Sequence, residues 1–222
     1  MFAPTMTGFA ERANLLTPEV GISTHIQDIV QVIENHNLEK VILLGHSYGG
    51  MIITGVVDRV PDCIAHLVYL DTFVPKDRES MADIVPNNVR GLRKEAIAHG
   101  DGWRVAPLHA MPFGIEEVFG VSQEPDLSWV KSMVTPQSLK TFEERLHLRN
   151  PDIVSSKPRT HIYCTGGGSF VNRTFFNIMR RTLMRRTLPP AGPGWRLRQL
   201  PTGHDCMITM PRELAGLLLE IA

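Results

Sequence analysis

The chain has 222 residues, and its 23 basic and 23 acidic side chains give it a formal net charge of zero at pH 7. This balance provides no broad positive field for nucleic acid or an anionic membrane, and the length suits one α/β domain with a sizeable core. Three cysteines without metal-ligand spacing, no apolar run of about 18 residues and no signal peptide together predict a cytoplasmic protein that needs neither metal nor other cofactor.

The first predicted elements are a short strand at residues 2–5, a loop, and a helix that begins near Thr24. In that helix Thr24 and Gln27 have the spacing of a capping box. Apolar side chains then recur three and four residues apart, which places them on one helical face. We expect this face to pack on a sheet; its members are Ile26, Ile29, Val30 and Ile33.

A sharp turn from a strand into a helix is predicted at Gly45–Gly50. The apolar run Val41–Leu44 indicates a buried parallel strand and residues 51–57 indicate a helix, so a G-x-S-x-G pattern stands at their junction. Small residues two positions before and after Ser47 let such a turn close, and its hydroxyl then stands free beside the first N–H groups of the helix. The pattern predicts Ser47 as a nucleophile and the Tyr48 N–H as an oxyanion donor. The alternatives are a turn without chemistry or a phosphate loop, although no phosphate-loop pattern is present.

Further strands alternate with helices, which indicates a mostly parallel sheet. A buried strand is predicted up to Leu70, directly before Asp71, and strand character returns before and after a glycine turn at residues 166–168. The elements expected here are strands at His66–Leu70, Thr160–Cys164 and Trp195–Leu200 and helices near Thr174–Arg186 and at Pro211–Ala222.

Residues 76–157 have a different texture, with many prolines and no clear strand. We expect them to form a helical lid inserted into one core built from residues 1–75 and 158–222. Aromatic and methionine side chains in the lid would line an apolar substrate pocket, the alternative being ordinary helices packed on the core. These side chains are Trp103, Phe113, Phe119, Trp129, Met81, Met111 and Met133.

One group of arginines stands out in the predicted helix near residues 174–186. A solvated helix face is the simplest interpretation, and an oligomer contact or an anionic ligand are the alternatives. The group consists of Arg173, Arg180, Arg181, Arg185 and Arg186.

A serine nucleophile needs a base, and the base needs an acid that holds its tautomer. His204 follows a predicted strand and comes last in the order serine, acid, histidine, so it is the predicted base. The alternative is a histidine that only ties down a loop.

The acid is harder to assign because residues 160–200, where it usually occurs, contain no Asp or Glu. Asp71 ends the preceding strand at the same sheet edge and is the preferred acid, with capping of the following turn as its alternative role. Asp205 adjoins His204 in sequence, so we expect its side chain to point elsewhere. Asp77 and Glu79 are weaker candidates.

The motifs at Gly45–Gly50, Ile64–Pro75 and Gly203–Asp205, with the apolar C-terminal helix, resemble the α/β-hydrolase superfamily. Within it the chain is similar to the branch of plant methylesterases, salicylate-binding esterases and hydroxynitrile lyases and to their bacterial esterase relatives. The resemblance implies an α/β-hydrolase fold and hydrolysis of small carboxylic esters, with Ser47 as nucleophile and His204 as base.

Two departures from this family pattern matter. Where plant-type members carry the acid, this chain has Gly166 and Gly167. Relatives also have about two dozen more N-terminal residues, including a strand ending in His-Gly that supplies a second oxyanion donor. We therefore expect an N-terminally truncated hydrolase, in which residues 2–5 or another chain fill a central strand position, or in which Met1 is not the natural start. Loss of one oxyanion donor costs about 100- to 1000-fold in rate, so weak activity is expected.

Two other functions stay open. A non-catalytic homologue that binds a small ligand would explain the missing acid and the missing oxyanion strand. A hydroxynitrile lyase is less favoured, because those relatives carry a lysine after the histidine where this chain has Asp205. The expected partner is a small ester, with no nucleic acid or membrane. Acyl and alcohol specificity and association as a homodimer are left open by the sequence.

Overall fold

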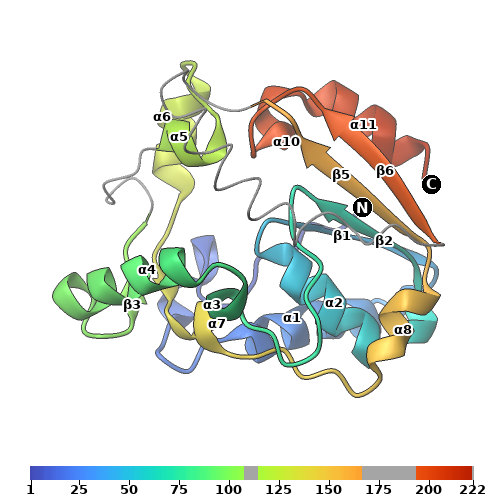
Figure 1. The fold of residues 1–222 in the computed structure, drawn as a ribbon, viewed down its shortest axis with the longest axis horizontal. Helices are drawn as coiled ribbons and strands as arrows, with labels where there is room; N and C mark the ends of the chain where they lie inside the picture. Colours follow the sequence, from blue (N-terminus) through green and yellow to red (C-terminus); the bar gives the residue numbers. More distant parts are fainter. Residues whose placement is uncertain (108–114, 167–193, 222) are drawn as a thin grey trace.

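A four-stranded parallel sheet forms the centre of the protein (Figure 1). The computed structural model describes residues 1–107, 115–166 and 194–221. Neighbouring strands pair in parallel in the order β1, β2, β5, β6. Their bounds are Val41–His46, Ile64–Leu70, Arg159–Cys164 and Trp195–Leu200. The predicted parallel sheet is confirmed.

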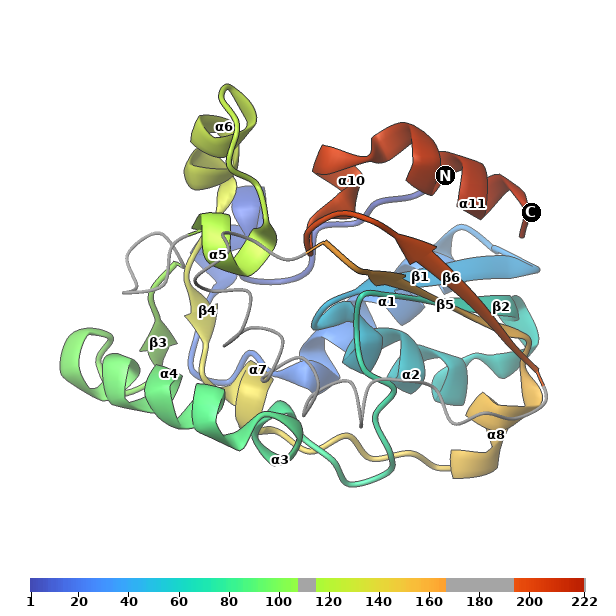
Figure 2. The ribbon, with the colours of Figure 1, turned by 45° about the horizontal axis from the view of Figure 1, so that its top comes forward.

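Helices cover both faces of this sheet (Figures 1 and 2). Strand β2 is therefore buried on both faces: Leu67 and Tyr69 pack in the core on one face, and Val68 and Leu70 pack with Leu214 on the other. Successive side chains of a strand point to opposite faces, so a strand covered on both faces requires an uninterrupted apolar run. One face carries α1 (Ile22–Asn35), α2 (Gly49–Arg59) and α8 (Pro151–Ser156), and the other carries α10 (Cys206–Thr209) and α11 (Pro211–Leu219).

Residues 81–107 and 115–143 lie beyond the edge where the strands end (Figure 2). Here two strands of two residues each pair antiparallel, although the sequence indicated no clear strand. Such short strands leave no alternation to detect. The elements are α3 (Met81–Ile84), α4 (Pro86–His99), β3 (Arg104–Val105), α5 (Ile115–Phe119), α6 (Asp126–Met133), β4 (Gln137–Ser138) and α7 (Lys140–Glu143).

The N-terminal stretch differs from the prediction, because residues 2–5 form no strand. They lead into η1 (Ala10–Leu15), and the Thr7 N–H and hydroxyl donate hydrogen bonds of 2.7 and 2.9 Å to the Asp28 carboxylate of α1. This anchor holds the stretch against α1. Within the described residues, β1 therefore pairs with β2 alone.

Helix α1 begins two residues earlier than its predicted capping box. Gly21 is the N-cap, and its N–H donates to Thr24 Oγ1 at 3.2 Å. Thr24 thus lies inside the first turn and satisfies the N-cap backbone from there.

Three further observations complete the fold. A short helix η2 (Pro61–Cys63) precedes β2. The predicted helix near residues 174–186, with its arginine group, lies outside the described residues. Across the described ranges, every helix is too short or too polar to cross a bilayer.

Candidate active site

Ser47 occupies a strained turn between β1 and α2. Its φ is 52°, in the left-handed region that costs a residue with a side chain on the order of 1–3 kcal/mol. A Cβ added at Gly45 would overlap the Gly49 carbonyl, and one at Gly50 would overlap Thr72. A Cβ at Gly49 would meet nothing within 4 Å. The sequence predicted that small residues are needed two positions before and two positions after Ser47. Gly45 is required as predicted, but the second required glycine is Gly50, three positions after Ser47, and not Gly49.

Strand β2 and the loop after it hold this turn in place. The Ser47 N–H donates to the Leu70 carbonyl at 3.2 Å, and the Thr72 hydroxyl donates to the Ser47 carbonyl. With both backbone groups of Ser47 bound, the strained conformation is maintained. Among the described residues, the N–H of Tyr48 has no acceptor, so it is available to an anion beside Ser47.

Asp71 and His204 come together at the carboxyl edge of the sheet. Asp71 Oδ2 lies 2.7 Å from His204 Nδ1, and Asp71 Oδ1 accepts the Cys164 N–H at 2.9 Å. Burial by itself raises the pKa of Asp71, but the hydrogen bond and charge of His204 and the Cys164 N–H outweigh it, so this pKa is lowered. An ionised Asp71 can only accept, which assigns the proton to His204 Nδ1 and leaves Nε2 as the basic nitrogen.

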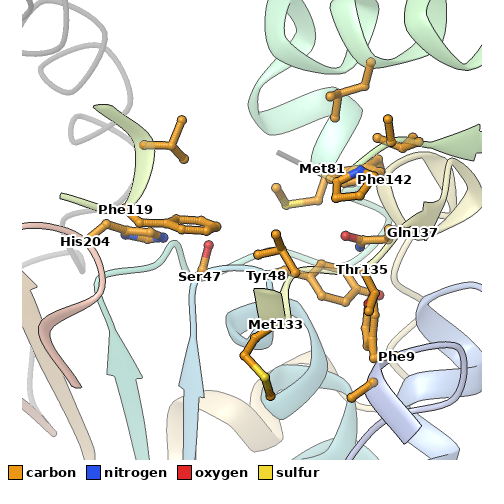
Figure 3. A pocket seen from close by; sticks show the side chains of 17 residues that line it. Phe9, Ser47, Tyr48, Met81, Phe119, Met133, Thr135, Gln137, Phe142 and His204 are labelled. Carbon is orange, nitrogen blue, oxygen red and sulfur yellow. The ribbon is translucent and has the colours of Figure 1, made fainter. Parts of the chain in front are cut away.

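Ser47 and His204 line the same cavity. In Figure 3 the Ser47 hydroxyl and the His204 ring point toward one another beside Phe119. Within the described part of the chain no hydrogen bond joins the two side chains, and such contacts commonly tighten only when substrate is bound.

The cavity has a volume of about 450 Å³, within the range of small-molecule sites. Of the lid side chains expected to line it, Met81, Phe119 and Met133 do so, whereas Trp103 and Trp129 do not. Met111 and Phe113 lie outside the described residues. The other lining residues are mostly apolar, namely Phe9, Ala10, Tyr48, Leu92, Val105, Ala106, Pro107, Val118, Val134 and Phe142, and two of them, Thr135 and Gln137, are polar.

Sequence reasoning missed two groups of residues at this site. Phe9 and Gln137 line the cavity from segments that showed no motif, because only the folded chain brings them to Ser47. His161 was placed only as a strand residue, yet its Nε2 lies 2.8 Å from the Thr72 carbonyl and so supports the loop that binds Ser47. The one feature of the sequence that could have indicated this role is the presence of a polar histidine within a strand predicted to be buried.

Beside His204, His46 and Asp205 form a second polar contact. His46 Nε2 lies 3.0 Å from the His204 carbonyl and donates to it. Burial, and then the charge of His204, lower the pKa of His46 to about 3, while burial raises the pKa of Asp205 to about 6. His46 is therefore neutral whenever Asp205 is ionised, and their 3.8 Å contact is not an ion pair.

These three residues are also the one group among the described residues whose ligand atoms could reach a metal, since the atoms lie within 4.8 Å of one another. His46 Nε2 already donates to a carbonyl, and His204 Nδ1 is bound to Asp71. The donor set is thus largely committed to hydrogen bonds within the protein.

The raised pKa of Asp205 predicts that Asp205→Asn stabilises the protein at pH 8. The folded state holds this proton up to about pH 6, while the unfolded chain releases it near the ordinary value of 3.8, so stability falls as the pH rises between the two. Removing the buried charge should raise the free energy of unfolding by about 3 kcal/mol at pH 8 and by little below pH 4. Urea unfolding at both pH values measures this, with the exposed Asp62→Asn as control. Equal stability of the Asp205 variant and the parent at pH 8 would contradict it.

Comparison with known proteins gives relatives along the whole chain. The alpha/beta hydrolase family matches residues 2–217. A carbendazim hydrolyzing esterase of Nocardioides sp. (strain SG-4G) is 36% identical over 227 residues, covering 100% of this chain and 87% of that protein. Methylesterase 10 of Arabidopsis thaliana is 23% identical and covers 90% of this chain and 74% of its own length.

Solved structures agree in fold. An extracellular alpha/beta-hydrolase from a Paenibacillus species superposes with a TM-score of 0.73 at 21% identity, over 98% of this chain and 85% of that one. The methylesterase MES16 of Arabidopsis gives 0.65 at 15% identity, over 97% and 84%. The expected fold with flanking helices is confirmed by these likenesses.

Proposed function

The chain belongs to the alpha/beta hydrolase family, and from that premise we propose that it is a serine esterase that cleaves small carboxylic esters. Ser47 is the nucleophile, His204 the base and Asp71 the acid that orients it. The observation that carries this proposal is the 2.7 Å contact of Asp71 with His204 in the cavity that also holds Ser47.

The proposed reaction uses these groups in turn. Ser47 Oγ attacks the ester carbonyl carbon while His204 Nε2 takes its proton. The ionised Asp71 stabilises the imidazolium through Nδ1, and its lowered pKa keeps it ionised at neutral pH. His204 then passes the proton to the leaving alcohol, and a water molecule activated by the same base hydrolyses the acyl-enzyme.

The Tyr48 N–H is the proposed oxyanion donor. It is free of other acceptors among the described residues and adjoins the Ser47 hydroxyl at the start of α2. The Tyr48 N–H is the one donor that we propose from the described residues, and the loss of one of two donors costs about 100- to 1000-fold in rate. We therefore expect turnover of activated esters to exceed that of alkyl esters.

The apolar cavity favours esters with an apolar body. The Nocardioides relative is named for hydrolysis of carbendazim, and the Arabidopsis relative is named a methylesterase. Methyl esters and carbendazim are therefore the compounds to assay first, together with p-nitrophenyl acetate.

A fluorophosphonate probe tests the proposal directly. An activated Ser47 should form a covalent phosphonyl adduct, which mass spectrometry of the digested protein locates to its peptide. Denatured protein is the control, because labelling should require the folded site. A native protein that binds the compounds above but acquires no adduct on Ser47 would favour a non-catalytic binding homologue.

A further inference from the structure

Gln137 is, with Thr135, one of two polar residues in the mostly apolar wall of the cavity across from Ser47. It belongs to β4, and Figure 3 shows its amide pointing into the cavity from the wall opposite Ser47 and His204. Met81 and Phe142 flank it in the same view. The amide is half-buried among apolar neighbours that offer it no hydrogen bond, so its orientation decides which group a ligand must present to it.

The hydrogen bonds around Thr141 fix that orientation. The Thr141 hydroxyl donates its single proton to the Ser138 carbonyl at 2.7 Å, and only 1% of Thr141 is exposed. Its oxygen can therefore only accept from Gln137, whose Nε2 lies 2.7 Å away. This arrangement turns Gln137 Oε1, an acceptor, toward the cavity.

Nearby hydroxyls leave this acceptor unpaired. His25 Nε2 donates to the Thr7 carbonyl at 2.9 Å, so His25 Nδ1 is an acceptor and takes the Tyr48 hydroxyl proton at 3.1 Å. The Tyr48 proton is thus committed outside the cavity. No described residue, Thr135 included, donates a hydrogen bond to Gln137 Oε1.

We propose that Gln137 is a specificity-determining residue that selects esters whose apolar body ends in an N–H or O–H donor, remote from the reacting carbonyl. This inference rests on the proposed esterase function of the same site. A substrate with such a donor pairs with Oε1, whereas an apolar end leaves Oε1 desolvated and unpaired, which a polar site rejects strongly.

A pair of esters of the same size tests this selection. Methyl 3-(4-hydroxyphenyl)propanoate and its 4-methyl analogue differ only in a hydroxyl against a methyl group. The parent protein should prefer the hydroxyl ester by about 10-fold in kcat/KM. Gln137→Met keeps the side-chain length but removes the acceptor, and its apolar wall should bring the ratio to one or below.

The ratio of two substrates is independent of the fraction of folded enzyme, so partial misfolding of the variant does not affect it. Gln123→Met makes the same chemical change at an exposed position of the chain and should keep the parent ratio. The 4-amino ester, which also carries a donor, should follow the hydroxyl ester.

Different results would refute the role of Gln137 and the esterase function. If both esters are hydrolysed with a ratio near one, or if Gln137→Met keeps the parent ratio, the role of Gln137 is refuted while the esterase function stands. If neither ester is hydrolysed, calorimetry measures the dissociation constants of both esters for the Ser47→Ala variant and for the Ser47→Ala, Gln137→Met double variant. The ratio of the two dissociation constants then replaces the ratio of kcat/KM. Equal affinities for the two esters would then refute the role of Gln137.

Discussion

Replacing Ser47 by alanine is expected to reduce kcat for p-nitrophenyl acetate by at least about 10⁴-fold, because no acyl-enzyme can then form. Ser47 Oγ makes no hydrogen bond within the described residues, so the substitution removes only the nucleophile. Alanine also keeps the Cβ and therefore the backbone strain of the turn. Steady-state hydrolysis measured beside a thermal melt separates lost chemistry from lost folding.

The matched control for this prediction is Ser122→Ala, which removes the same hydroxyl from an exposed position. It should keep the parent activity. Undiminished turnover by a folded Ser47→Ala protein would rule out the proposed nucleophile, and with it the serine mechanism.

Replacing Asp71 by asparagine is expected to lower kcat by about 10⁴-fold at neutral pH. The Cys164 N–H, which donates to Asp71 Oδ1, would hold the asparagine carbonyl oxygen in that place and turn its NH₂ toward His204 Nδ1. A donor facing Nδ1 favours the tautomer with the proton on Nε2, which cannot take a proton from Ser47. The measurement is kcat for p-nitrophenyl acetate at pH 7 to 8, with folding checked by the melting temperature.

Asp205→Asn is the comparison that identifies the acid, since Asp205 is the other carboxylate near His204. Its side chain lies 3.8 Å from His46 Nε2 and forms no hydrogen bond with the described residues. We expect this variant to retain kcat within about 10-fold, because the hydrogen bond to His204 Nδ1 comes from Asp71 and not from Asp205. A loss as large as that of Asp71→Asn would transfer the role of the acid to Asp205.

Local patterns predicted the part of the site that local geometry controls. The run Val41–Leu44, the glycines and the apolar residues after Ser47 specify a strand, a turn and a helix, since each follows from neighbouring residues. The β2 strand and its terminal Asp71 were predictable for the same reason. The carboxyl ends of parallel strands meet at one sheet edge, so the sequence alone predicted that Asp71 lies near the His204 loop.

Other predictions failed where tertiary contacts outweighed local preference. Residues 2–5 have strand character, yet the hydrogen bonds of Thr7 with Asp28 hold that stretch against α1. The helix start moved from Thr24 to Ile22 because Gly21 supplies the N-cap. Short strands β3 and β4 depend on pairing between residues more than 30 positions apart, which no local window contains.

The sequence by itself therefore determined the order of strands and helices, the strained turn at Ser47 and the short set of side chains able to act with it. Only the tertiary structure decided which carboxylate faces His204 Nδ1 and which way the Gln137 amide points. The physical reason is that the first outcome depends on a hydrogen bond from a distant segment, the Cys164 N–H to Asp71. The second depends on the Thr141 hydroxyl, four residues from Gln137, and on the cavity that distant segments build around this amide. Periodicity reports which face of an element is buried, whereas hydrogen-bond direction is set by the partner that folding brings within about 3 Å.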